Sequence, residues 1–520
     1  MPPKENKSTG SQEGQISQTT KISTDALDDS GGQISETTKI STDALDDSGG
    51  QISETTKIST DSGGQISKTT KISKTTKISK TTKISTDPLD DLEAQISKTC
   101  CIYPLIPSED RSCCIYAVPE TLIEINGKKA YQPRVVSIGP YHRSQPQVMA
   151  MEKHKVEVLS LLLHRKKFGL DKLLSITRPL VAEARKCYSK EMNLESITDH
   201  NDRFLKMIVV DGCFLIELFR KADKQKLFEF NDPLATMAWA VPYIYGDLLL
   251  LQNQIPFFVL ERLFETSKMP GESNAPLSLL ALRFFNKVMQ RPNQVIESFT
   301  FSRNQTVPFH LLDLVRSSLL SPHLEPSKKN EGNTQTCRLI HCISKLRRAG
   351  IKLELREADS FLDVKFRKGK LGNRVIQMPN ITMDYHMKSF LVNCLAFEQL
   401  HNSRSKQFTV YANFLDCLVN TAKDVDYLCD QNIIENYFGK DGDVVLFINK
   451  MGKDLAFDDD QFYLSQLFKD VDECYRNKCY VQVASFMRRY FNTPWSFLSA
   501  LAALFLLVLT FLQTFYTINP

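Results

Sequence analysis

Apolar residues recur at helical spacing along most of the chain between residues 113 and 490. In Phe204–Phe219 and Pro276–Val288, for example, Leu, Ile, Val and Phe return every three or four positions, which is the period of a helix with a buried face. The same spacing is found in four further segments: Val156–Leu163, Leu248–Phe264, Phe408–Val419 and Val425–Tyr437. The pattern predicts a large helical body.

One stretch of the body has a different period. The segments Ile351–Leu355, Phe361–Phe366 and Arg374–Met378 are short and alternate between apolar and polar residues, with glycines before the third. This pattern predicts a small antiparallel sheet inserted in the helical body. Residues 321–336 (SPHLEPSKKNEGNTQT) are polar and rich in turn formers, which indicates a linker between two helical halves.

The C-terminal segment is apolar over a much longer range. Trp495–Tyr516 contains 22 residues, mostly Leu, Phe, Ala and Val, and this length matches a helix that spans a bilayer. Pro494 suits the first position of such a helix, and Trp495 and Tyr516 stand where interfacial aromatic residues belong. A buried core helix is the alternative, but core helices of this length usually carry a polar face. We therefore predict a transmembrane anchor over residues 494–516.

The N-terminal region, residues 1–99, is built from repeats. QISQTTKISTDALDDSGG, from Gln15 to Gly32, returns almost unchanged in Gln33–Gly50, and Tyr103 is the first aromatic residue of the chain. Each unit has too few apolar residues to offset its chain entropy. We expect a disordered tail followed by the body over residues 100–490. The predicted fold class is therefore mainly α, with an inserted antiparallel β-sheet, a disordered N-terminal tail and one C-terminal transmembrane helix.

Charge and cysteine content favour a cytosolic body. The first ten residues are hydrophilic, which excludes a signal peptide at this end. Arg488 and Arg489 precede the apolar segment and no charge follows it, so the positive-inside rule places the body in the cytosol. Many of the 13 cysteines lie in apolar stretches, as expected in a reducing compartment. The plasma membrane is the expected location, with the endoplasmic reticulum as the alternative. Asn304 and Asn380 lie in glycosylation sequons and would be acceptors if the body were lumenal.

The composition gives little support to nucleic-acid or metal binding. Lys plus Arg is 65 and Asp plus Glu is 60, a net charge of +5, which provides no general field for a polyanion. Cys337, His341 and Cys342 are close in sequence, as are Cys474 and Cys479, but no second pair completes a zinc spacing. We predict no metal and no cofactor.

The classical enzyme signatures are also missing, so we predict no catalytic residues and no enzyme activity. Cys213 is a candidate nucleophile, because Met207–Val210 has the pattern of a strand and Asp211-Gly212 that of a turn, which would lift the thiol onto a helix N-terminus. One long buried helix is the competing interpretation. An enzyme of a novel helical class would use a pocket that gathers at least two of four groups with shifted pKa values. These groups are Asp211, Cys213, His310 and Glu398.

A series of motifs in one order carries a resemblance to a known family. The chain reads CCIYAVPETLIEINGKKAYQPRVVSIGPYHR from Cys113, MIVVDGCFLIELFR from Met207 and DLLLLQNQIPFFVLERLF from Asp247. HLLDLVR, SFLDVKF, AFEQ, NTAKDV and PWSFLSALAALFLLVLTFLQT follow in that order. Together they resemble the plant-specific membrane proteins called domain of unknown function 247. Gln252 stands where the family usually has Glu, which removes a charge from a local ion pair, and the repetitive tail is not a family feature.

The resemblance implies a mainly helical plant protein with a C-terminal membrane anchor and no established activity. Some grass members resemble determinants of pollen self-incompatibility, a role that none of these residues transfers. The leading hypothesis is a membrane-anchored recognition or signalling protein that acts through protein–protein contact. A structural membrane tether is a further alternative. Ser496, Ala500 and Ala503 lie at helical spacing and would let two anchors pack as a homo-oligomer.

Overall fold

The computed structural model describes most of the chain from residue 113 onward and four strands before it. The described residues are 20–24, 37–45, 51–60, 66–72, 113–190, 201–224, 235–269, 272, 274–299, 307–320, 339–369, 374–457, 462–477, 482 and 494–519. The chain divides into two compact units, Met1–Pro107 and Ser108–Pro520. The expected linker at 321–336 lies outside the described residues.

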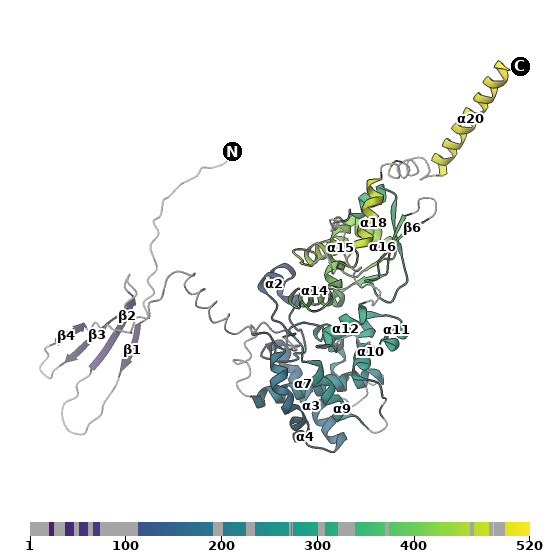
Figure 1. The fold of residues 1–520 in the computed structure, drawn as a ribbon. Coiled ribbons are helices and arrows are strands. Elements are labelled where there is room, and N and C mark those ends of the chain that lie inside the picture. Colours follow the sequence, from purple (N-terminus) through teal and green to yellow (C-terminus); the bar gives the residue numbers. More distant parts are fainter. Residues whose placement is uncertain are drawn as a thin grey trace, which may run out of the picture. The chain divides into compact units, whose positions relative to one another are not determined.

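The first unit contains a four-stranded antiparallel sheet built from the repeats (Figure 1). Its strands, in sheet order, are β1 (Thr20–Thr24), β2 (Thr37–Leu45), β3 (Gln51–Thr60) and β4 (Ile66–Ile72). Ile22 of one repeat stands opposite Ile40 of the next, so equivalent KIST segments pair with each other. These strands were not expected, and the Thr and Ile content that favours extended backbone accounts for them. For the rest of residues 1–99 disorder stays a prediction.

Helix α7 (Asn201–Asp223) is the centre of the N-terminal half of the body, because it is buried on nearly every face. It packs against α3 (Met149–Lys166), α4 (Leu170–Thr177), α9 (Phe257–Ser267) and α10 (Leu277–Met289). Shorter helices complete this half: α2 (Glu120–Asn126), η1 (Lys128–Ala130), η2 (Pro146–Val148), η3 (Arg178–Leu180), α5 (Val181–Lys186), η5 (Ala235–Ala240), α8 (Val241–Asp247) and α11 (Asn293–Ser298).

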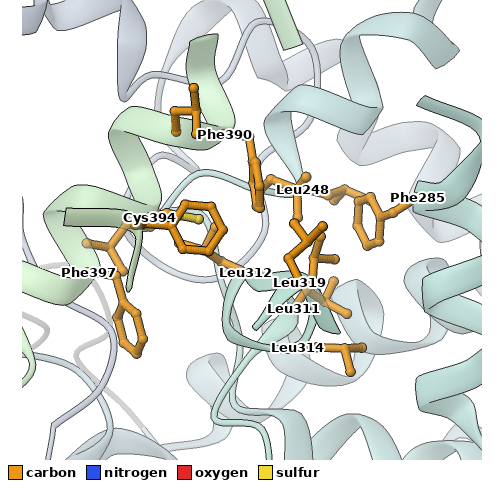
Figure 2. Close-up of a cluster of buried hydrophobic side chains, with 14 of the residues drawn as sticks. Leu248, Phe285, Leu311, Leu312, Leu314, Leu319, Phe390, Cys394 and Phe397 are labelled. Atoms are coloured by element: carbon orange, nitrogen blue, oxygen red, sulfur yellow. The ribbon is translucent and has the colours of Figure 1, made fainter. Parts of the chain in front are cut away.

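Helix α12 (Leu311–Leu319) joins the two halves through the core. Its leucines lie between Phe285 of α10 and the side chains of α14 (Tyr385–Leu400), as Figure 2 shows with Phe390 and Phe397. All these side chains are buried in one continuous hydrophobic cluster. The body therefore has one core rather than two.

The C-terminal half surrounds α14 with further helices and two small sheets. Helix α16 (Ala422–Asp430) begins at a capping box in which Thr421 and Asp424 satisfy each other's backbone N–H groups, so the motif NTAKDV is a helix start. The remaining elements are α13 (Ile343–Arg348), α15 (Gln407–Leu418), α17 (Asp441–Met451), α18 (Ser465–Arg476), β5 (Ile351–Leu355), β6 (Lys365–Lys368), β7 (Arg374–Met378), β8 (Ile381–Met383) and β9 (Ile434–Asn436).

The inserted sheet has the predicted first and third strands but a different topology. Its order is β5-β7-β6, with β5 parallel to β7 and β6 antiparallel to β7, so the sheet is mixed and the antiparallel prediction was wrong. The second strand begins at Lys365, because Phe361 and Leu362 are buried in the preceding turn and Val364 donates its N–H to the carbonyl of Leu362. Periodicity alone did not reveal this shift.

Two predicted helices are also shorter than expected. In Leu248–Phe264 the helix begins only at Phe257, after Pro256, because residues 248–254 form a turn stabilised by side chains described below. In Val425–Tyr437 the helix ends at Asp430, Asn432 adopts a left-handed conformation (φ 55°) and β9 follows. The other predicted helices are confirmed, with small changes at their ends except for Val156–Leu163, which is the middle of the longer helix α3.

Candidate functional site

Asp211 lies at the centre of a buried ion-pair network between α3 and α7. Its Oδ1 is 2.7 Å from Nζ of Lys155, and both side chains are fully buried. Lys155 also pairs with Glu152 at 2.5 Å and donates to the carbonyl of Ser137. The other carboxylate oxygen accepts the N–H of Gly139 at 2.9 Å. Every charge in this group is matched by protein atoms, as a buried charge requires.

The motif VVSIGP owes its fixed conformation to this network and to the turn after α8. Gly139 has φ +80°, and a Cβ there would lie 2.5 Å from the carbonyl oxygen of Gln254, so only glycine fits. The Asp247 carboxylate accepts the consecutive N–H groups of Arg134, Val135 and Val136 at 2.7–3.0 Å. Burial nevertheless raises the pKa of Asp247 to about 6, because the three N–H donors only partly offset desolvation.

The amide side chains of the QNQIP motif act as a clamp on the same segment. Asn253 accepts the N–H of Ile138 at 2.6 Å and donates to the carbonyl of Val136 at 3.0 Å. Gln254 donates to the carbonyls of Leu248 and Leu250. Gln252 is buried, and within the described part of the chain its Nε2 has no hydrogen-bond partner. The strongest sequence motif therefore fixes the backbone of residues 136–138 and of the turn after α8.

His310 and Glu398 belong to a second buried network around α12. Nε and Nη2 of Arg316 donate to Oε1 of Glu398 at 2.9 and 2.7 Å, and both residues are fully buried. Oε2 of Glu398 accepts the N–H and hydroxyl of Thr409, each at 2.8 Å. The Glu398 carboxylate belongs to α14 and thus accepts hydrogen bonds from N–H groups at the start of α15, which have no partner within that helix. The pair fastens α12, α14 and α15 together.

His310 precedes α12 and caps it. Its Nδ1 accepts the N–H of Asp313 at 3.2 Å, and Nε2 is 3.1 Å from the carbonyl oxygen of Cys114. A carbonyl can only accept, so Nε2 carries the proton and the ring is neutral. Burial lowers the pKa of His310 to about 4, consistent with this form.

Cys213 is not a nucleophile on a helix N-terminus. It lies inside the single long helix α7, so the strand–turn–helix interpretation was wrong and the buried-helix alternative is confirmed. A Cβ on Gly212 would lie 2.5 Å from Cδ1 of Leu263, which shows the close packing of α7 on α9. Burial raises the pKa of Cys213 to about 12, which keeps it a thiol.

The cysteine and histidine candidates for metal binding do not assemble in the part of the chain that is described. Cys337 and Cys479 lie outside it, and the ring of His341 packs against Tyr475 with centroids 3.9 Å apart. Within the described residues there is no group of three His, Cys, Asp or Glu side chains that could hold a metal ion.

Two hollows are described on the body, and none of Asp211, Cys213, His310 and Glu398 lines either of them. The larger has a cavity volume of about 590 Å³ and lies between α10, the end of β5 and β8. Its two arginines are held by protein groups. Arg291 donates to the carbonyl and hydroxyl of Ser318, and Arg356 pairs with Asp363 at 2.9 Å. The smaller, of about 400 Å³, lies between α14 and α17.

Of the two candidate glycosylation sites, Asn304 lies outside the described residues. Asn380 is half-buried in the wall of the larger hollow. Its Nδ2 donates to the carbonyl of Asn432 at 2.9 Å and to Glu435 at 3.3 Å. The acceptor nitrogen is thus engaged in the folded body.

The apolar C-terminal segment forms helix α20 (Pro494–Ile518). Phe497–Ile518 has a mean hydropathy of 2.2, and none of the most apolar stretch is buried. It is the one helix in the described chain that is long and apolar enough to cross a membrane, by length and composition. Trp495 and Tyr516 are 80% and 69% exposed, so the alternative of a buried core helix finds no support.

Comparison with known proteins places these features in a family. The family model for a plant protein of unknown function, DUF247, matches residues 115–509. The chain belongs to the DUF247 family. It is 37% identical to UPF0481 protein At3g47200 of Arabidopsis thaliana over 428 residues, which is 78% of this chain and 86% of that protein. It is also 22% identical to Putative UPF0481 protein At3g02645 of the same plant, over 78% of this chain and 90% of that protein. No solved structure matches the chain at a significant level.

The DUF247 match begins at the Ile115 segment and extends into α20, so the apolar helix is part of the family region, whereas the repeat sheet is not. Several of the motifs that carry the DUF247 resemblance fix the loop at 134–139 or begin helices. Sequence reasoning missed Lys155 and Arg316, the partners of Asp211 and Glu398, because a lone basic residue in an apolar segment carries no spacing signal.

Proposed function

We propose that this DUF247 protein is a membrane-anchored protein–protein recognition or signalling module, in which α20 holds the helical body at a membrane. The observation that carries the proposal is α20 itself, an apolar helix of 25 residues whose most apolar stretch has no buried residue. An exposed apolar helix of this length is unfavourable in water and is expected to be buried by lipid or by protein. A bilayer core of about 30 Å matches its length.

The buried charges support recognition over catalysis. Asp211 and Glu398 are each held in ion pairs and backbone hydrogen bonds inside the core, and neither described hollow gathers the four enzyme candidates. An enzyme of a novel class remains the alternative, and so does a structural tether. A small-molecule product made by the purified chain would favour the enzyme.

The proposal includes a cytosolic body and the plasma membrane, with the endoplasmic reticulum as the second choice. Its support is the sequence: Arg488 and Arg489 precede α20, and no charged residue follows it. Homo-oligomerisation through the stripe of Ser496, Ala500 and Ala503 stays a prediction.

The test compares the full chain with a version that ends at Tyr490, both expressed in plant cells. We expect the full chain to stay in the membrane fraction after alkaline carbonate extraction and the shortened chain to appear in the soluble fraction. Proximity labelling from the body should then mark a reproducible set of proteins that depends on the anchor. Equal distribution of both versions, or labelling indistinguishable from a membrane-anchored fluorescent protein, would refute the proposal.

A further inference from the structure

A surface on one side of the body combines exposed aromatic and basic side chains around the smaller hollow. We call it the aromatic–basic surface. It is formed by Arg134, Trp239, Tyr243, Tyr385, Lys388, Tyr437, Leu446 and Lys450. These residues come from the loop after η1, from η5 and α8, from α14, from the segment after β9 and from α17. The hollow joins the members from α14 and α17.

Three of the aromatic members pack against neighbouring side chains, and all four except the half-buried Tyr385 are exposed to solvent. The guanidinium of Arg134 lies 3.5 Å from the ring centroid of Tyr385 and 5.7 Å from that of Tyr243. Trp239 packs edge-on against Tyr243, with centroids 6.4 Å apart. Trp239 and Tyr437 are nevertheless 68% and 72% exposed, and Leu446 is 55% exposed. Large apolar side chains fixed at the surface in a cluster mark an interaction site more often than isolated ones do.

The charges of this surface are predominantly positive, and the buried Asp247 carboxylate offsets only part of the charge of Arg134. Within the described chain, no carboxylate lies within ion-pair distance of Arg134, Lys388 or Lys450, and Lys388 instead faces the rings of Phe438 and Phe447 at 5.7 and 5.5 Å. Asp443 is the single acidic residue that lines the hollow. By contrast, the basic side chains of the larger hollow have partners.

Exposed Lys128 and Lys129 strengthen the same field. They belong to η1, which packs against α14. The surface therefore attracts a negatively charged partner.

The shape of the surface distinguishes between partners of that charge. A lipid headgroup is polar throughout, whereas here a hollow of about 400 Å³ with apolar walls from Phe438, Leu446 and Phe447 lies between the basic groups. Such a hollow takes an apolar side chain, and Trp, Tyr and Arg are the residues that dominate protein–protein binding energy. The combination fits a peptide with acidic residues on both sides of an apolar anchor.

We propose that the aromatic–basic surface docks an acidic segment of a partner protein, which inserts one apolar side chain between α14 and α17. This inference rests on the proposed recognition function and specifies the partner's chemistry.

The test uses the full chain in phosphatidylcholine nanodiscs and a random-peptide display library. We expect the selected peptides to be enriched in Asp and Glu around a Leu, Ile, Phe or Trp, and to bind more weakly as salt is raised. Arg134→Glu, Lys450→Glu and Leu446→Ala change exposed side chains, so the fold should survive, which the melting temperature checks. Each should weaken binding of a selected peptide about tenfold. Lys352→Glu on β5, the same charge change outside the surface, is the matched control and should leave binding unchanged.

Three results would overturn the inference. The selected peptides could lack acidic residues, they could bind all variants equally, or no peptide could be enriched at all. Phosphatidylserine vesicles, added to the same nanodiscs, test the lipid source of negative charge. Capture of vesicles that is lost in Lys450→Glu, without acidic peptides among the binders, would assign the surface to lipid. None of these outcomes affects whether the chain stays in membranes, so a failure here is distinguishable from a failure of the proposed function.

Discussion

His310 is the residue whose protonation would most directly oppose the fold. In the folded chain its pKa is lowered to about 4 by burial, and proton uptake at Nδ1 would set an N–H against the N–H of Asp313. The unfolded chain binds the proton at the ordinary pKa of about 6.5. The stability that neutral His310 contributes is therefore present above about pH 6.5 and is lost progressively as the pH falls toward about 4.

We expect the free energy of unfolding of the body to fall by about 2 kcal/mol from this residue alone between about pH 7 and pH 5. His310→Asn keeps a capping acceptor and should remove that part of the pH dependence. Urea unfolding at the two pH values, for both proteins, measures it. Asp247 acts in the opposite direction, since its pKa is raised to about 6 in the folded chain, but it is common to both proteins and cancels. Equal pH slopes would contradict the assignment of His310.

Cys213 offers a second test at the scale of one side chain. Because it is fully buried and burial raises its pKa to about 12, a maleimide should modify it far more slowly in the folded chain than half-exposed Cys342. Peptide mapping by mass spectrometry after a short exposure follows both residues in one sample, and urea-unfolded protein provides the control in which both react. Equal rates in the folded chain would reopen the nucleophile hypothesis.

At the scale of elements, the sequence predicts well what depends on local periodicity. The strands β5 and β7 and the helices α10 and α15 follow from apolar spacing and turn residues, and their observed bounds differ little from the expected ones. The parallel pairing of β5 with β7 could not be predicted this way, because the alternation of a strand fixes its faces but not the direction of its neighbour.

The buried polar pairs were invisible for a related reason. Arg316 and Glu398 are separated by 82 residues along the chain, and neither the spacing nor the composition of either segment points to the other. The turn at residues 248–254 was mistaken for a helix because its leucines have helical spacing, while the side chain of Asn253 bonds to backbone groups at Ile138 and Val136. Side-chain to backbone bonds of this kind compete with helix formation.

Among the polar contacts that join α12, α14 and α15, the Arg316–Glu398 pair should contribute most to the free energy of unfolding. Glu398→Gln removes the closer of the two carboxylates that face the buried Arg316 guanidinium and leaves only Asp313, at 3.6 Å. We expect a loss of about 3 kcal/mol in the free energy of unfolding. Arg316→Met combined with Glu398→Met removes both charges and should cost much less than the sum of the single changes. Denaturant unfolding of the original chain, Arg316→Met, Glu398→Met and the double variant completes the cycle. Additive losses would show that the two side chains do not stabilise each other.

At the scale of the whole molecule, topology decides which partners the body can meet. With the body in the cytosol, neither Asn304 nor Asn380 should carry a glycan, whereas a control sequon added beyond Pro520 should be modified. A glycosidase-sensitive mobility shift in plant cells measures both. Asn380→Gln and Asn304→Gln separate the two natural sites if a shift is seen without the control sequon. A glycan on either site would place the body in the lumen or at the cell surface and reverse the charge argument from Arg488 and Arg489.

The anchor itself is tested by placing charge at different depths of α20. Leu504→Arg with Leu507→Arg puts two guanidinium groups near the middle of the apolar window, where each costs about 3 kcal/mol to insert. Thr514→Arg with Thr517→Arg has the same charge and spacing near the end of the helix, where long side chains reach the interface. We expect the first variant to leave the membrane fraction and the second to remain.

If both remain, the depth of the charge is irrelevant, and α20 must be covered by protein rather than lipid. If both leave, the added charge itself prevents association, and the central position of the window has no special role. A helix that crosses the bilayer is supported only if the first variant leaves the membrane fraction and the second stays. The two variants carry the same added charge and the same body, so they differ only in the depth of that charge.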